Sequence, residues 1–396
     1  MPGMPLGLYL SVPFCRTKCS YCNFASDVFS KAVFQRYVDR VCNDLDHAAE
    51  TASRMGGQFE GAVDSVYLGG GTPTVLASSE LERLFTAIRQ DFDLAPDAEI
   101  TVECAPGTLS DIMIETLLGC GVNRVSLGVQ SFVDVEAAAV GRLHKRATVL
   151  DDIARLRKAG VADINVDLIA GLPHQTVESW QFSLDELVGC GVPHASVYML
   201  EVDEDSRLGR ELIAGGAKYH AHFVPDEDLV ADLYEVACER LNAAEIRQYE
   251  ISNFAQRGRE SRHNLKYWTR QPYLGFGVDA HSMLKSSTVT GEAVRFATAD
   301  GLEEYVAGTE FRRTTVSRHE ALEEAFFLGL RLAGGVNLAS LQDEFGADAV
   351  QSYDSVITDL VNAELMEKND DSIRLTSRGR MLSNEVFEHF LSRAAK

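Results

Sequence analysis

The chain has 396 residues, of which 45% are hydrophobic and 24% are charged, as expected of a globular protein with a sizeable core. Its formal net charge of −22 argues against a nucleic-acid partner, because phosphate binding needs a concentration of Lys and Arg. The sequence contains no apolar run long enough to span a membrane. Eight cysteines are too few for a disulfide scaffold, and the first residues lack the pattern of a signal peptide, so we expect a cytoplasmic protein.

Short apolar strands alternate with amphipathic helices over the first 245 residues. The expected strands are residues 8–12, 65–68, 99–103, 124–129, 163–169 and 195–200. The expected helices are residues 30–54, 79–92, 110–118, 148–159, 177–188 and 228–244. Short links between such units favour a parallel sheet with right-handed crossovers. Six units are too few for a closed eight-stranded barrel, so the sequence predicts an α/β fold with an open, TIM-like (β/α)6 partial barrel.

Three cysteines follow the first expected strand. Cys15, Cys19 and Cys22 have the spacing C-x3-C-x2-C. Tetrahedral zinc and ordinary iron–sulfur sites normally take four protein ligands, so three thiolates leave one metal position open for another molecule. A structural zinc site or unrelated thiols is the alternative, but no second Cys or His pair follows at zinc-finger distance.

Polar and glycine residues gather where the expected strands end, which is where parallel barrels bind ligands. The second strand runs into G-G-G-T-P at residues 69–73, whose glycines allow close backbone approach and expose N–H groups, although a plain tight turn is the alternative. The next three strands end near Glu103, Gln130 and Asp167, and Arg142 follows the fourth strand. Taken alone, Gln130 and Arg142 are ordinary loop residues.

The cysteine motif, with these strand ends, resembles the radical S-adenosylmethionine (SAM) family. In that family three cysteines hold a [4Fe–4S] cluster, and SAM binds the fourth iron through its amino and carboxylate groups. The resemblance covers nearly the whole chain. It implies that Cys15, Cys19 and Cys22 are the metal ligands. The SAM site that it implies consists of Tyr9, Gly70, Gly71, Thr72, Glu103, Gln130, Arg142 and Asp167.

A second motif, H-N-x-x-Y-W at residues 263–268, lies in the segment 246–310, which we expect to connect two domains. It resembles the branch that contains the anaerobic coproporphyrinogen III dehydrogenases and the radical SAM heme chaperones. The motif is typical of the chaperones and implies that His263 binds heme. Imidazole is a good axial ligand for heme iron, and Tyr267 and Trp268 could stack on a porphyrin. Alternatively, the two aromatic residues fill a core and His263 bonds to the backbone.

Two further features favour the chaperones over the dehydrogenases. Dehydrogenases of this family usually carry a fourth cysteine in C-x3-C-x2-C-x-C, at the position of Phe24. The first strand starts early, so we expect no N-terminal extension that contacts porphyrinogen. We therefore expect a protein that binds heme and passes it to an unidentified acceptor protein, with an electron donor as a possible further partner. The alternative is an oxygen-independent coproporphyrinogen III dehydrogenase, which converts propionate side chains to vinyl groups by radical oxidative decarboxylation.

We expect residues 311–396 to form a separate C-terminal domain, after the radical SAM core of residues 1–245. Its expected helices are residues 318–332, 338–345 and 350–363, followed by a hairpin at 365–375 and a helix from 377. Helices followed by a β-hairpin, the wing, are typical of an α+β winged-helix-like domain. That fold alone does not indicate DNA binding, because fold does not determine function.

Overall fold

The computed structural model describes residues 4–59, 62–289 and 291–391. Within these residues, six parallel strands form a curved sheet in the order β1, β3, β4, β5, β6, β7. This arrangement is the α/β fold that the sequence predicts. The bounds of the strands are β1 Leu6–Val12, β3 Ala62–Gly70, β4 Asp93–Cys104, β5 Arg124–Gln130, β6 Asp163–Ala170 and β7 His194–Met199.

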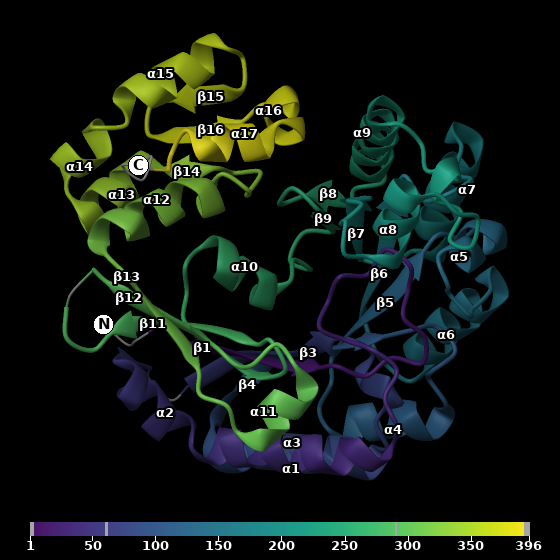
Figure 1. Cartoon of the computed structure of the whole chain (residues 1–396). Coiled ribbons are helices and arrows are strands. Elements are labelled where there is room, and N and C mark those ends of the chain that lie inside the picture. The colour runs from purple at the N-terminus through teal and green to yellow at the C-terminus, as the bar shows by residue number, and fades with distance from the viewer. Residues whose placement is uncertain (1–3, 60–61, 290, 392–396) are drawn as a thin grey trace.

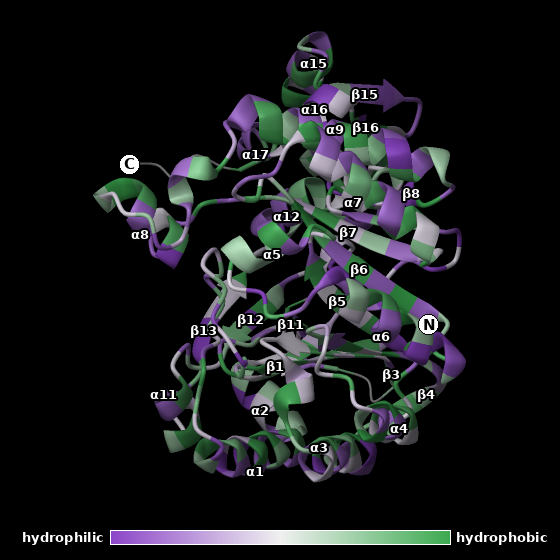
Figure 2. Ribbon diagram, turned by 90° about the vertical axis from the view of Figure 1, so that its right-hand side faces the viewer, coloured by the Kyte–Doolittle hydropathy of each residue, from purple (hydrophilic) through white to green (hydrophobic). Residues whose placement is uncertain are grey.

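Helices cover the outer face of this sheet (Figure 1). The bounds are α1 Ala32–Asp46, α2 Ala48–Met55, α3 Ser78–Asp91, α4 Asp111–Gly119, α5 Asp134–Ala139, α6 Arg146–Lys158, α7 Val177–Cys190 and α9 Glu227–Ala243. The helix α8 (Arg207–Ala214) lies apart from them, and the Leu208 N–H donates to the Ser20 carbonyl at 2.8 Å. The single helix expected at 30–54 is divided at His47, whose φ of −100° and ψ of 14° interrupt the helical backbone. Green and purple residues alternate along α1 and α3 in Figure 2, as expected of helices with one buried face.

The two faces of each strand have different environments, because successive side chains point to opposite sides. Along β3, Val66 and Leu68 are fully buried in the main hydrophobic core with the outer helices. Ser65, Tyr67 and Gly69 alternate with them and face the interior of the partial barrel. This alternation places polar groups in a row inside the barrel, from the start of the strand to its end.

The described residues between 247 and 316 extend the sheet at both edges. Strand β9 pairs antiparallel with β7, and β10 pairs parallel with β1. Beyond β10, strands β11, β12 and β13 continue the sheet antiparallel. The bounds are β2 Gly57–Gln58, which pairs with β11, β8 Arg247–Gln248, β9 Asn253–Ala255, β10 Tyr273–Gly277, β11 His281–Ser286, β12 Ala293–Ala297, α11 Leu302–Ala307 and β13 Arg312–Val316.

Residues 318–391 form helices and a three-stranded sheet around a second hydrophobic core that includes Phe326, Ile357 and Phe390. The expected hairpin is present as β15 and β16, whereas the helix expected at 350–363 is divided at Tyr353. The bounds are α12 Arg318–Gly329, β14 Val336–Asn337, α13 Leu338–Phe345, α14 Ala347–Gln351, α15 Asp354–Asn362, β15 Met366–Asn369, β16 Ser372–Leu375, α16 Ser377–Met381 and α17 Ser383–Glu388.

The helix α10 (Arg262–Trp268) carries the H-N-x-x-Y-W motif and lies in the middle of the ring of strands in Figure 1. Its first N–H groups, from Arg262 and His263, each donate to the Glu99 carboxylate at 3.1 Å. An acidic group at a helix N-terminus is favourable because it meets unpaired N–H groups and the positive end of the helix dipole. The buried Lys266 forms an ion pair with Asp64 at 2.7 Å. Helix α10 is therefore fixed near the start of β3, through Asp64, and at the middle of β4, through Glu99.

Candidate radical SAM site

The cysteine loop joins β1 to α1. The Cys15 N–H donates to the Asp27 carbonyl at 3.0 Å, and the Thr72 hydroxyl lies 3.9 Å from the Cys15 sulfur. Burial raises the pKa of the Cys15 thiol, and the nearby Cys22 and Cys19 raise it further. The structure therefore places Cys15 next to the glycine turn, with Cys22 and Cys19 within electrostatic range of it. Among the described residues, however, no three His, Cys, Asp or Glu side chains are close enough together to hold a metal ion as they stand. The thiolate forms of the three cysteines would need a bound cation for stabilisation.

The glycine turn after β3 contacts the chain that leads into the cysteine loop. The Gly71 N–H donates to the Val12 carbonyl at 2.8 Å, and the Thr72 N–H donates to the Phe14 carbonyl at 2.7 Å. A Cβ atom on Gly71 would lie 2.7 Å from both carbonyl oxygens. Gly70 has a φ of +93°, a conformation that favours glycine. The turn is thus a close backbone packing between two strand ends, which a side chain would disrupt.

Glu103 lies at the end of β4, directly beside this turn. Its Oε2 accepts the Gly70 N–H at 3.1 Å, and its Oε1 accepts the Tyr67 hydroxyl at 2.8 Å. Burial raises the pKa of Glu103 to about 7, and the nearby Asp167 raises it too, while the two hydrogen bonds and Arg142 lower it. A carboxylate has about four acceptor positions, so Glu103 can still accept hydrogen bonds from ligand hydroxyls.

Gln130 and Arg142 meet at the end of β5. Gln130 has a φ of +70°, and the register between β5 and β6 shifts between Gly128 and Gln130. A Cβ atom on Gly128 would lie 2.7 Å from Arg142 Nη2, so this glycine makes room for the guanidinium. Arg142 Nε is buried and has no hydrogen-bond partner among the described residues. Because buried donors are nearly always paired, this atom indicates a place for an acceptor from outside the chain.

Asp167 on β6 is the last of the polar residues that the sequence predicts at the strand ends. Its carboxylate accepts the Ser126 hydroxyl at 3.1 Å and the Asn165 amide at 2.6 Å. Burial raises its pKa, whereas these bonds and Arg142 lower it. Arg142 lies within electrostatic range of both Asp167 and the cysteine loop, where Cys19 and Cys15 act on it.

His263 lies elsewhere in the barrel. Its Nδ1 is 3.1 Å from the Ser65 hydroxyl, its Nε2 is 2.9 Å from the Tyr267 hydroxyl, and the side chain is 1% exposed. Burial lowers its pKa to about 3, so the imidazole is neutral. Ser65 stands five residues before Gly70 on β3. At about 3.3 Å per residue, His263 is roughly 16 Å along the strand from the glycine turn.

Tyr67 is the site residue that the sequence does not single out. Its hydroxyl holds Glu103, and its ring packs on His263, so it touches both predicted sites. The sequence could have identified Tyr67 through its position two residues before Gly69, because the alternation of side chains along a strand places both residues on the interior face of β3. Glu99 could have been identified in the same way, because it lies four residues before Glu103 on β4 and therefore on the same face of the strand.

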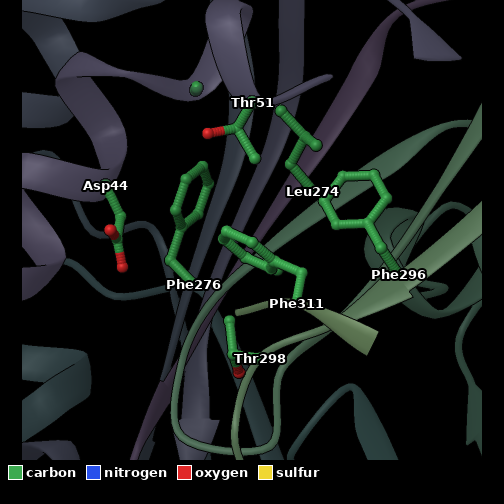
Figure 3. A pocket seen from close by; sticks show the side chains of 9 residues that line it. Asp44, Thr51, Leu274, Phe276, Phe296, Thr298 and Phe311 are labelled. Atoms are coloured by element: carbon green, nitrogen blue, oxygen red, sulfur yellow. The ribbon is translucent and has the colours of Figure 1, made fainter. Parts of the chain in front are cut away.

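Two other concave features lie outside this interior. One pocket lies between α1, α2 and strands β10 and β12, where Phe276, Phe296 and Phe311 gather (Figure 3). It opens on the outer, helix-covered face of the sheet, since Phe276 is level with the outward-facing Leu10 of β1. A wider cleft beside the cysteine loop is lined by residues that include Arg16. Neither contains the polar residues that the strand ends bring together.

The sequence matches known proteins over nearly its full length. Residues 9–187 match the model of the radical SAM superfamily, and residues 316–382 match that of the HemN C-terminal domain. The heme chaperone HemW of Lactococcus lactis is 34% identical over 98% of this chain and 97% of its own length. This chain belongs to the radical SAM family of HemW heme chaperones. The HemW of Bacillus subtilis is also 34% identical, over 97% of this chain and 98% of its own length.

Among solved structures, the coproporphyrinogen III oxidase HemN of Escherichia coli, a radical SAM enzyme, has a TM-score of 0.84. The match covers 98% of this chain and 91% of HemN, at 22% sequence identity, and it shows a shared fold. The resemblance predicted from the cysteine motif and from H-N-x-x-Y-W is thus confirmed at the level of the family.

The site residues fit the [4Fe–4S] cluster and SAM that the radical SAM family implies. Cys15, Cys19 and Cys22 would supply the iron ligands, the unpaired Arg142 Nε would donate a hydrogen bond to a polar ligand, and Glu103 would accept one. When bound and reduced, such a cluster supplies the electron that cleaves SAM in radical enzymes. The chain's own residues would hold the ligand: Gly71 allows close backbone approach, Arg142 offers a donor and Glu103 an acceptor.

The raised pKa of Glu103 predicts a pH-dependent stability. Between 4.5, its ordinary value, and about 7, the folded ligand-free protein binds a proton on Glu103 that the unfolded chain lacks. The free energy of unfolding contributed by this group therefore falls as pH rises through that window. We expect Glu103→Gln to lose less stability than the unmodified protein between about pH 5 and about pH 7.5, measured by urea denaturation.

The exposed Glu50 on α2 supplies the matched control. Glu50→Gln removes the same charge without touching the barrel interior, so its stability should follow the unmodified protein at both pH values. Equal pH dependence in Glu103→Gln and in the unmodified protein would contradict a raised pKa for Glu103.

Proposed function

We propose that this chain is a heme chaperone that holds a [4Fe–4S] cluster through Cys15, Cys19 and Cys22, binds SAM at the open iron and passes heme to an acceptor protein. The observation that carries the proposal is the 34% identity with the Lactococcus lactis heme chaperone HemW, which extends over nearly the whole of both chains. An electron donor for the cluster and a cytoplasmic location belong to the same proposal. No helix of the described ranges has the length and hydropathy to span a membrane.

The residues of the SAM site have separate proposed roles. Gly70, Gly71 and Thr72 would receive the methionyl part of SAM at the turn, and Glu103 would accept the ribose hydroxyls. Arg142, whose Nε lacks a partner, would donate to the ligand, with Gln130 and Asp167 beside it. The last predicted member, Tyr9, lies near the turn: its hydroxyl is 3.5 Å from the position of a Cβ atom on Gly70.

We propose that His263 is the heme ligand. Coordination of iron would require a neutral imidazole with a free and accessible ring nitrogen. Iron binds a lone pair on a neutral imidazole, and the low pKa of His263 keeps the ring neutral. Both ring nitrogens, however, are in hydrogen bonds, to Ser65 and to Tyr267. Coordination therefore needs at least one of these bonds to break and the ring to become accessible. Movement of α10 would provide both.

The test of the heme ligand is a hemin titration of His263→Ala, followed by the Soret absorption. Loss of an iron–nitrogen bond should weaken hemin binding by at least about tenfold, the equivalent of roughly 1.4 kcal/mol. His194→Ala is the matched control, because His194 is 2% exposed and also has both ring nitrogens in hydrogen bonds, to Asn165 and Tyr249. Equal hemin binding by both variants and the unmodified protein would exclude His263 as the ligand.

The dehydrogenase alternative is tested separately. Phe24 occupies the position of the fourth cysteine of the dehydrogenases, and its side chain is 65% exposed beside the cysteine loop. The likeness to HemN concerns the fold and does not decide between the two activities. We expect reduced protein incubated with SAM and coproporphyrinogen III to yield no protoporphyrinogen. Formation of that product would contradict a chaperone without dehydrogenase activity.

A further inference from the structure

Tyr67 stands between the helix α10 and the SAM site. Its ring centroid is 5.4 Å from that of the His263 imidazole, and the two planes lie 29° apart, a stacked contact. Its hydroxyl donates to Glu103 Oε1 at 2.8 Å. Glu103 in turn accepts the N–H of Gly70 in the glycine turn. One side chain thus touches both the predicted heme ligand and the carboxylate predicted to hold SAM.

The surroundings leave Tyr67 little freedom. The centroid of the Tyr9 ring lies 6.1 Å from that of the Tyr67 ring and 6.3 Å from that of the His263 ring, so the three rings pack against one another. A Cβ atom on Gly69 would lie 2.8 Å from both the Tyr67 ring and the Glu103 carboxylate. The glycine therefore lets the ring and the carboxylate meet at close range. The orientation of Glu103 depends on where the Tyr67 ring lies.

We propose that Tyr67 is a positioning residue that couples α10 to the SAM site: while His263 packs on its ring, Tyr67 holds Glu103 in place, and departure of His263 toward heme iron loosens that carboxylate. The inference rests on the proposed heme and SAM sites and adds a relation between them. Heme binding at His263 removes one packing face from Tyr67 and so weakens SAM binding. Because coupling free energies are reciprocal, SAM weakens heme binding by the same factor.

The first test measures SAM affinity in the full-length protein with a reconstituted cluster, by calorimetry under anaerobic conditions. Tyr67→Phe keeps the ring on His263 and removes only the hydroxyl that holds Glu103. We expect SAM binding at least about tenfold weaker, close to the lower end of the range for a lost hydrogen bond to a charged group. SAM binding by Tyr67→Phe equal to that of the unmodified protein would overturn the proposal.

Tyr305→Phe is the matched control. Tyr305 is also buried, and its hydroxyl donates to a carboxylate, Asp44, at 2.6 Å, but on α11 and α1 outside the barrel interior. This variant should lose comparable stability and keep the SAM affinity. A similar loss of SAM affinity in both variants would show a general effect of destabilisation and would overturn a specific role for Tyr67.

A pH profile separates positioning from packing. The Tyr67 hydrogen bond lowers the pKa of Glu103, and so do Gly70 and Arg142, whereas burial and Asp167 raise it. Removing the hydroxyl raises that pKa, so the pH at which SAM binding reaches half its maximum should move upward in Tyr67→Phe. Tyr305→Phe should keep the original profile. An unchanged profile in Tyr67→Phe contradicts its contact with the carboxylate.

A double-mutant cycle tests the link to α10. His263→Ala should weaken SAM binding although His263 lies far from the glycine turn. In the Tyr67→Phe background, the same substitution should have little further effect, because the connection to Glu103 is already lost. Additive effects of the two substitutions would show independent sites and would overturn the coupling.

Hemin titrations distinguish this inference from the proposed function. SAM should weaken hemin binding about fivefold or more in the unmodified protein, the lower end of typical couplings, and should not do so in Tyr67→Phe. If His263→Ala binds hemin normally, the proposed heme ligand fails, whereas the SAM measurements still decide the role of Tyr67. If hemin binds through His263 but SAM has no effect on its affinity, the coupling fails and the chaperone proposal stands.

Discussion

Serine in place of Cys15, Cys19 and Cys22 is expected to leave the anaerobically purified chain without iron and acid-labile sulfide. A hydroxyl at neutral pH does not supply the thiolate that an iron–sulfur cluster needs. The chain should still fold, because the three cysteines lie on a loop outside the strands and helices. Iron and sulfide determination, the visible absorption spectrum and far-ultraviolet circular dichroism measure these outcomes.

The control replaces cysteines of the barrel that lie away from the loop. Cys42 on α1 and Cys190 on α7 pack against the outer face of the sheet, and Cys42→Ser with Cys190→Ser should keep the iron and sulfide content. Retention of the cluster in the loop variant, or zinc instead of iron in the unmodified protein, would contradict the radical SAM site. SAM binding could then not depend on an open iron position.

The barrel and its strand ends could be predicted because their signals are local. Alternating apolar and polar residues identify a strand such as β3 within a few positions, and parallel strands place their ends at one edge. Glu103, Asp167 and the glycine turn then meet as the topology requires. The helix boundaries at His47 and Tyr353 were missed, because both breaks occur inside continuous amphipathic patterns without glycine or proline.

The position of α10 could not be predicted from the sequence. Its anchors join residues far apart in the chain: Glu99 binds the N–H of His263 across 164 positions, and Ser65 binds the imidazole across 198 positions. The periodicity of apolar residues within one segment gives no information about contacts between residues so far apart in the chain. The motif identified the residue types, but the sequence left open whether His263 faces a ligand or a hydrogen-bond partner. The structure shows it hydrogen-bonded, with Tyr67 between it and the strand ends.

Gly71→Ala is expected to cause the largest loss of SAM binding among single substitutions at the glycine turn. The new Cβ atom would lie 2.7 Å from the backbone oxygens of Val12 and Phe14, which cannot rotate away as side chains can. The turn must therefore separate from the strand that leads into the cysteine loop. Overpacking typically costs about 1–3 kcal/mol, which corresponds to a roughly 5- to 150-fold weaker affinity if the strain falls on the bound state. Calorimetry on the cluster-reconstituted variant measures it.

Gly119→Ala provides the control, because a Cβ atom at this last residue of α4 would meet nothing within 4 Å. It should bind SAM as the unmodified protein does, and it should be slightly more stable because alanine favours a helix. Normal SAM binding by a folded Gly71→Ala variant would mean that the two strand ends separate without moving the ligand. The glycine turn would then be a structural bend, and the polar groups of Glu103, Arg142 and Asp167 would have to hold SAM without it.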